Sequence, residues 1–305
     1  MRKLIIISIL ILLLSGCSAQ SGQNDRMSVV SVSFPGYSFA KEIAGENADI
    51  TLLLPLGTEA HGYEPTPKDI IKIQNCDLFI YGGGESEHWV EEILSSVDTE
   101  VSTLAMTNCT ELLKAEVPKG AEENHEHSDD FDEHVWTSPK NAIKIVEKIS
   151  AVLCEKDIKN TEIYKKNTAD FVSELSELDA AFSELETENK TLVMGDRFPF
   201  LYLAKEYNIS YYAAFPGCAG ESEPGASTVA ALIDKVKSDN IPVVFYTEFS
   251  NQKVAKTICE ATNAKPLMLH SCHNVSVEDF ENGESYLSLM YKNLANLKEA
   301  FNYAD

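Results

Sequence analysis

Three of the seven histidines in this 305-residue chain follow segments whose pattern predicts a β-strand. His61 comes after DITLLLPLGTEA, His134 comes after the loop that follows TEVSTLA, and His270 ends the segment PLMLH. Neutral imidazole is a good zinc ligand, and imidazoles from separate loops can surround one ion. Because open parallel sheets bind ligands at the carboxyl ends of their strands, these positions predict one metal site in which His61, His134 and His270 meet.

Two further histidines lie in the acidic stretch EENHEHSDDFDEHVW at residues 122–136, which ends with His134. His134 precedes Val-Trp and a Ser-Pro helix start, so we expect it to belong to an ordered loop. His125 and His127 lie among glutamates and aspartates, and the sequence leaves two interpretations open for them: a solvated loop or a weak metal-capture segment. His88, in EHWVEEIL, is expected at the surface or at a helix terminus.

Short β-branched runs alternate with helical patterns on both sides of a long helical region. This alternation predicts an α/β fold of two lobes, each with a small parallel sheet flanked by helices. Between them, apolar residues recur at helical spacing from Tyr164 to Phe182, which predicts a backbone helix of roughly 26 residues. We expect this helix to join the lobes and the metal site to lie between them. The predicted domains are an N-terminal lobe at 27–158, the linking helix at 159–188 and a C-terminal lobe at 189–305.

The N-terminus, MRKLIIISILILLLSGCSAQ, has the pattern of an export signal: two basic residues, an apolar run and small residues before Cys17. The apolar run is too short to span a membrane as a helix. Its ending, LSGC, resembles the bacterial lipoprotein box, which implies that residues 1–16 are a signal peptide and that Cys17 carries the lipid. Residues 17–26 are polar and predict a flexible tether. We therefore expect an extracytoplasmic protein that is lipid-anchored to the bacterial cell membrane.

The formal net charge of −23 at pH 7 makes nucleic acid an unsuitable partner, because phosphate binding needs clustered Lys and Arg. An acidic surface would instead concentrate cations. The cysteines form no CxxC pair, so the spacing does not indicate a cysteine zinc cluster. Cys218 and Cys272 each follow a predicted strand, and an extracytoplasmic location would permit a disulfide between them.

The segment GTEAHGYEPTPKDI at residues 57–70 resembles the first metal-ligand loop of the substrate-binding lipoproteins of zinc and manganese ABC importers, the cluster A-I group. That loop reads close to H-x-Y-E-P-[ST]-x-x-D, and six residues match it: His61, Tyr63, Glu64, Pro65, Thr66 and Asp69. EHWVEEIL, HVWTSPKNA and the long helix also resemble parts of that family. The resemblance implies a monomeric, non-enzymatic receptor that delivers Zn²⁺, or alternatively Mn²⁺, to an ABC permease. It also implies that His61 and His134 are metal ligands.

The third ligand departs from the family pattern. Alignment of FLYLAKEY without a gap puts Arg197 where a histidine or glutamate ligand normally lies, and a guanidinium has no lone pair to give. Asp196 is our tentative third ligand. The alternatives are a water molecule, or a carboxylate from Glu223 or Glu248. A buried guanidinium needs an acidic partner, so we expect Arg197 beside Glu248, Glu223 or Asp196.

The fourth ligand differs too, because His270 takes the place of the family's aspartate after the last strand. His273 and Cys272 are close enough in sequence to be alternatives. Three imidazoles with few carboxylates favour zinc over manganese. A zinc hydrolase with Glu64 or Glu248 as its base is a rival interpretation, but the chain has no HExxH motif. A surface adhesin is another rival.

Overall fold

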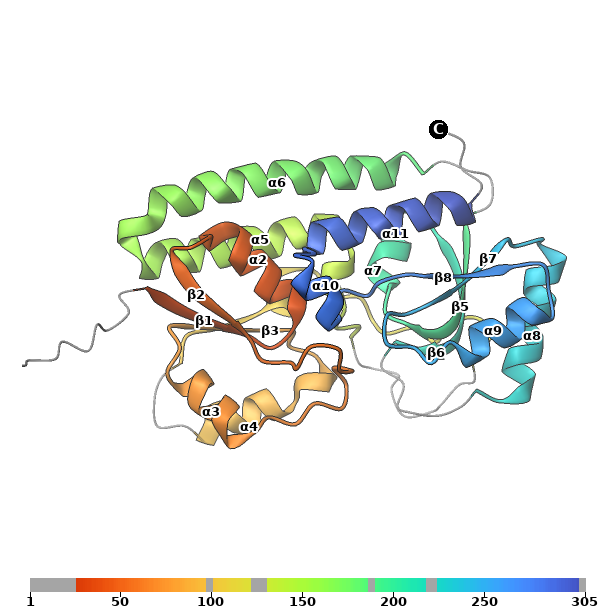
Figure 1. The fold of residues 1–305 in the computed structure, drawn as a ribbon, viewed down its shortest axis with the longest axis horizontal. Coiled ribbons are helices and arrows are strands. Elements are labelled where there is room, and N and C mark those ends of the chain that lie inside the picture. Colours follow the sequence, from red (N-terminus) through yellow and green to blue (C-terminus); the bar gives the residue numbers. More distant parts are fainter. Residues whose placement is uncertain (1–25, 97–100, 122–130, 186–189, 218–223, 302–305) are drawn as a thin grey trace, which may run out of the picture.

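The computed structural model describes residues 26–96, 101–121, 131–185, 190–217 and 224–301. It contains two four-stranded sheets in which all neighbouring strands are parallel (Figure 1). The first has the order β2-β1-β3-β4, from β1 (Met27–Ser31), β2 (Ala48–Leu52), β3 (Leu78–Tyr81) and β4 (Thr103–Ala105). The second has the order β6-β5-β7-β8, from β5 (Thr191–Phe198), β6 (Ser210–Pro216), β7 (Val243–Tyr246) and β8 (Lys265–Met268). We call the halves that carry these sheets the N-terminal lobe and the C-terminal lobe. The predicted α/β fold class is confirmed.

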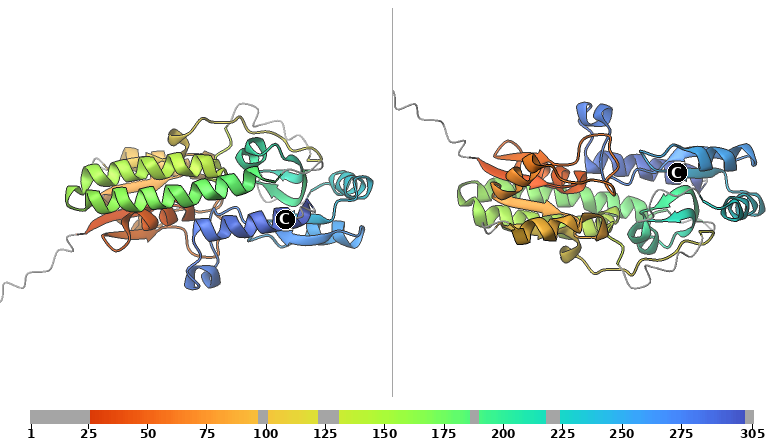
Figure 2. Two further views of the ribbon diagram at one scale, coloured as in Figure 1. Left: turned by 90° about the horizontal axis from the view of Figure 1, so that it is seen from above. Right: turned by 90° about the horizontal axis from the view of Figure 1, so that it is seen from below.

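Helices cover both faces of each sheet (Figures 1 and 2). In the N-terminal lobe, one face packs against α2 (Phe34–Ala44), α5 (Pro139–Lys156) and α6 (Thr161–Ser183), and the other against α3 (Pro67–Gln74) and α4 (Trp89–Ser96). In the C-terminal lobe, one face packs against α7 (Leu201–Glu206) and α11 (Tyr286–Ala300), and the other against α8 (Ala226–Ser238) and α9 (Lys253–Glu260). The short α10 (Val277–Glu281) precedes α11, and single 3₁₀ turns occur at η1 (Glu85–Glu87), η2 (Met106–Cys109), η3 (Val135–Thr137) and η4 (Ile158–Asn160).

The main hydrophobic core extends through both lobes. Alternate residues of each strand face opposite sides of its sheet, so β3 and β7 each contribute to this core and to a smaller one on the other face. Ile80 of β3 and Phe245 of β7 both belong to this shared core, whereas Phe79 and Val244 face the two smaller cores under α3 and α4 and under α8 and α9. The two lobes therefore pack as one body on the side of α6 and α11.

Helix α6 buries the apolar stripe that its sequence predicts: Tyr164, Phe171, Leu175, Leu178 and Phe182 are its buried residues. It has 23 residues, slightly fewer than expected. Figure 2 shows α5 and α6 side by side, with α6 continuing toward the C-terminal lobe. The lobe boundaries near residues 158 and 188 stay predictions.

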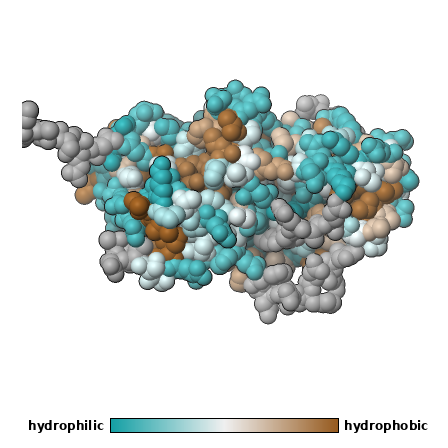
Figure 3. Space-filling model, turned by 60° about the horizontal axis from the view of Figure 1, so that its bottom comes forward, coloured by the Kyte–Doolittle hydropathy of each residue, from teal (hydrophilic) through white to brown (hydrophobic). Residues whose placement is uncertain are grey.

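The face drawn in Figure 3 is mostly hydrophilic, with apolar side chains in small separate groups. No helix within the described ranges is both long and apolar enough to cross a bilayer. Cys17, Cys218, His125, His127 and Glu223 lie outside the described residues.

Candidate metal centre

Four side chains bring their donor atoms within 4.8 Å of one another: His61, Glu133, His134 and His273. His61 lies in the loop between β2 and α3, Glu133 and His134 lie directly before η3, and His273 lies in the loop between β8 and α10. Both lobes thus contribute, and the cluster holds three imidazoles and one carboxylate. Such a set of nitrogen and oxygen donors suits a tetrahedral zinc ion.

The loop that carries His61 is shaped by the residues of the motif around it. Thr66 and Asp69 form a capping box at the start of α3, in which the Thr66 hydroxyl accepts from the Asp69 N–H and the Asp69 carboxylate accepts from the Thr66 N–H. The Nδ1 atom of His61 lies 3.0 Å from Glu59 Oε1, and its Nε2 lies 3.4 Å from Glu133 Oε1. With the Nδ1 proton donated to Glu59, the Nε2 lone pair is directed at the cluster.

His134 is fully buried and is held by the carboxylate two residues before it. Asp132 Oδ1 accepts from the backbone N–H of His134 at 2.9 Å and lies 3.1 Å from its Nδ1. This contact places the ring proton on Nδ1 and leaves the lone pair on Nε2. The Nε2 atom is buried and has no hydrogen-bond partner among the described residues. A buried acceptor of this kind is poised to bind a cation.

Glu133 presents one carboxylate oxygen to the three imidazoles. Its Oε2 accepts from the Ser86 N–H at 3.1 Å, whereas its buried Oε1 has no hydrogen-bond partner in the described part of the chain. A β-carbon at Gly84 would collide with the Glu133 side chain, so this approach requires glycine. Burial alone would raise the pKa of Glu133, but the neighbouring imidazoles, with His61 Nε2 3.4 Å from its Oε1, hold that pKa well below its ordinary value. Glu133 is therefore an anionic donor at neutral pH.

His273 completes the cluster from the C-terminal lobe. Its ring lies 5.3 Å from that of His61, 5.6 Å from that of His134 and 4.9 Å from that of Trp136, measured between centroids. Burial, and then the charges of His61 and His134, lower the pKa of His273 to about 3. Its imidazole is therefore neutral at physiological pH, which is the form that binds metals.

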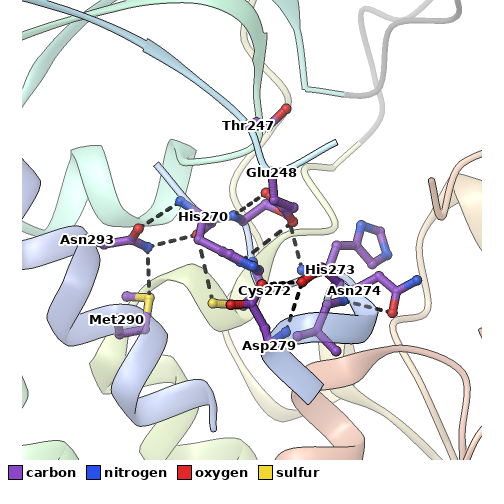
Figure 4. Close-up of polar contacts among 12 residues, drawn as sticks. Thr247, Glu248, His270, Cys272, His273, Asn274, Asp279, Met290 and Asn293 are labelled. Atoms are coloured by element: carbon purple, nitrogen blue, oxygen red, sulfur yellow. Dashed lines mark hydrogen bonds and ion pairs between the residues drawn. The ribbon is translucent and has the colours of Figure 1, made fainter. Parts of the chain in front are cut away.

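Two residues predicted as ligands lie outside this cluster. His270 Nδ1 accepts from the Cys272 N–H at 2.9 Å, because β8 ends at Met268 and the chain then turns back on itself (Figure 4). Asp196 accepts from the Arg197 N–H at 2.8 Å and from the Thr247 hydroxyl at 2.9 Å, so its carboxylate caps the end of β5 and the loop after β7. The structure thus places His273, which the sequence offered as an alternative, where His270 was expected. Glu133 was not anticipated.

Arg197 has an acidic partner, but not one of those expected. Its NH1 lies 3.4 Å from Glu59 Oε1 and 3.3 Å from His61 Nδ1, so the guanidinium of the C-terminal lobe reaches a carboxylate of the N-terminal lobe. Burial opposes ionisation of Glu59, but the hydrogen bond with His61 and the charge of Arg197 lower its pKa to about 2. Of the three expected partners, Glu248 binds Ser271 and Asp196 binds Thr247 and the Arg197 backbone, and Glu223 lies outside the described residues. Arg197 supports the loop of His61 instead of replacing a ligand.

Other predicted residues have the following places. His88 is exposed and directly follows η1, as expected, with its Nδ1 3.1 Å from the carbonyl of Glu85 at the start of that turn. Cys272 is a free, buried thiol, and its suggested partner Cys218 falls outside the described residues. Glu64 does not belong to the cluster. A cavity of about 540 Å³, lined from both lobes, borders His61, His273 and Arg197.

Replacing Asp196 with alanine should change metal affinity by less than about 10-fold, since the carboxylate contacts Thr247 and the β5 backbone and not the cluster. Competition against a chromogenic zinc chelator measures this directly. A loss of about 100-fold or more would mean that Asp196 does reach the ion.

A sequence profile of the family described as zinc-uptake complex component A, periplasmic, matches residues 29–300. The chain is 34% identical over 306 residues to the zinc-binding lipoprotein AdcA of Streptococcus pneumoniae, which covers 97% of this chain and 60% of that protein. It is 32% identical to the high-affinity zinc uptake system protein ZnuA of Bacillus subtilis, covering 97% of this chain and 96% of that protein. The chain thus spans about 60% of the length of the first of these relatives.

Two solved structures have the same fold along most of their length. The Zn(II)-bound ZnuA-like domain of S. pneumoniae AdcA superposes with a TM-score of 0.76 at 33% identity, over 91% of this chain and 99% of that one. The metal-dependent lipoprotein YcdH of B. subtilis superposes with a TM-score of 0.77 at 31% identity, over 90% and 100%. The family resemblance seen in the motifs is confirmed, and the chain belongs to the family of zinc-uptake complex component A proteins.

Proposed function

We propose that this protein is an extracytoplasmic receptor that captures zinc between its two lobes and delivers it to an ABC importer. The observation that carries the proposal is the meeting of three imidazoles and one carboxylate, from both lobes, within 4.8 Å. The names of its relatives, a zinc-binding lipoprotein and a zinc uptake protein, support the same cargo.

The ligands we propose are His61, Glu133, His134 and His273. Two of the imidazoles, those of His61 and His134, have Nδ1 next to a carboxylate, an arrangement typical of zinc-binding histidines. Manganese prefers more oxygen donors than this cluster offers. Four protein donors also leave no open position for a substrate, whereas catalytic zinc sites keep one. A receptor therefore fits the donor set better than a hydrolase.

The attachment and the partner are proposed on other grounds. Lipidation at Cys17 rests on the LSGC pattern, and it would hold the receptor near the membrane that contains the importer. The ABC permease rests on family membership. We propose that the receptor acts as a monomer.

The test is a titration of metal-stripped protein, made as a soluble form beginning at Ser18, with Zn²⁺ and Mn²⁺ under native mass spectrometry. We expect one tightly bound zinc ion, and manganese bound at least about 100-fold more weakly, because nitrogen donors dominate. Equal or tighter binding of manganese in direct competition would overturn the proposed cargo.

A further inference from the structure

The loop that carries His273, residues 270–275, is held at both ends by side-chain amides, one from α11 and one from within the loop itself. At its start, Asn293 of α11 pairs with the His270 backbone, accepting its N–H at 2.7 Å and donating to its carbonyl at 2.8 Å. At its end, the Asn274 side chain donates to the carbonyls of Pro55 and Thr58 at 2.8 and 2.9 Å, in the segment before His61. Figure 4 shows the two contacts between Asn293 and His270.

Glu248, just beyond β7, binds the middle of this loop with both carboxylate oxygens. Its Oε2 accepts from the Ser271 N–H at 2.9 Å, and its Oε1 accepts from the Ser271 hydroxyl at 2.6 Å. The Glu248 side chain is only 7% exposed. Hydrogen bonds to a buried carboxylate are stronger than those between neutral groups, so this pair fixes Ser271 firmly.

Ser271 also forms hydrogen bonds with two residues at the metal centre. Its hydroxyl oxygen accepts from the His273 N–H at 3.1 Å, and its carbonyl accepts from Trp136 Nε1 at 2.9 Å. A hydroxyl that donates to a carboxylate becomes a better acceptor, so the contact with Glu248 strengthens the one with His273. Trp136 lies two residues after His134, so Ser271 contacts both sides of the cluster.

Cys272, between Ser271 and His273, has a φ of +61°, in the left-handed region that a non-glycine residue seldom adopts. The surroundings must hold such a residue in place. Contacts on each side of it do so: Ser271 is bound by Glu248, and the His273 carbonyl accepts from the Phe34 N–H at 3.0 Å. If the first contact is lost, the backbone at Cys272 can relax and the His273 imidazole can turn away from the cluster.

We infer that Glu248, which supplies no donor atom, is a positioning residue: through Ser271 it sets the place of the His273 imidazole and so how long a zinc ion is retained. This inference rests on the proposed zinc receptor. When Glu248 becomes glutamine, either the N–H or the hydroxyl of Ser271 loses its acceptor, because the new NH₂ group must face one of these two donors. Substitutions around metal ligands typically weaken binding by about 10- to 100-fold.

The experiment compares Glu248→Gln, Ser271→Ala and the double variant with the unchanged protein. Zinc release is timed after adding an excess of a chromogenic chelator, and the visible absorption of the Co²⁺-loaded protein reports the coordination geometry. We expect each single variant to release zinc about 10-fold faster and to alter the Co²⁺ bands, while still binding one ion. The double variant should release zinc no more than slightly faster than Ser271→Ala, because both changes break the same path.

The matched control is Asp196→Asn, which changes a carboxylate in the wall of the same cavity without touching residues 270–275. Thermal melting of each metal-free variant shows whether it folds. If Ser271→Ala does not fold, Glu248→Gln, which keeps the size and shape of the side chain, still tests the inference. Wild-type release rates in both single variants, effects that multiply in the double variant, or an equal effect in Asp196→Asn would each overturn the inference. Failure of the unchanged protein to bind zinc would instead overturn the proposed function.

Discussion

His134→Ala is expected to abolish tight zinc binding, with a loss in affinity of at least about 100-fold, since structural zinc sites derive roughly 3 kcal/mol or more from each ligand. The His134 imidazole is fully buried, its Nδ1 lies against Asp132, and its Nε2 has no partner within the described residues except the ion that we propose. Alanine leaves three donors and a gap that water can fill only poorly. His61→Ala should have the same effect. Isothermal titration in the presence of a competing chelator measures the change.

His88→Ala is the control for that substitution, because His88 is exposed, does not belong to the cluster, and has its Nδ1 beside the Glu85 carbonyl. It should bind zinc like the unchanged protein. If His134→Ala retained affinity within about 10-fold, the cluster would not be the primary site.

The second large effect is a difference in zinc affinity between alanine variants of two histidines that lie three residues apart. His273→Ala should lose tight zinc binding by at least about 100-fold. His270→Ala should keep one zinc ion, within about 10-fold of the original affinity, but should unfold more easily by about 1–3 kcal/mol, because the Cys272 N–H loses its buried acceptor. Native mass spectrometry gives the stoichiometry, and urea unfolding of the metal-free proteins gives the stability. If His270→Ala lost zinc and His273→Ala retained it, the loop would be arranged differently when the ion is bound.

The fold was largely predictable because its signals are local. The alternation of apolar runs predicts both sheets, and the buried stripe of α6 follows directly from the spacing of Tyr164 to Phe182. His61 and His134 were predictable as donors because each lies in a motif that also fixes its own loop: the Thr66–Asp69 capping box follows His61, and a Ser-Pro helix start follows His134.

The rest of the candidate site depends on backbone direction, which residue spacing does not encode. The sequence predicted His270, with His273 as an alternative, whereas the chain direction at the left-handed residue Cys272 brings His273 to the cluster. Arg197 finds Glu59 across the lobes, a contact between residues 138 positions apart. Glu133 was the avoidable omission. It is a carboxylate directly before a predicted ligand, in the sequence D-E-H, and its position alone could have nominated it.

The donors are divided unequally between the lobes. Among the described residues, the N-terminal lobe holds His61, Glu133 and His134, and the C-terminal lobe adds His273. With the ligands proposed above, loading would proceed in order: an arriving ion would first meet a partial chelate on one lobe, and His273 from the other lobe would complete its coordination. Unloading would run in the opposite order. One bond, made by a loop with a strained backbone, then separates a loosely held ion from a trapped one.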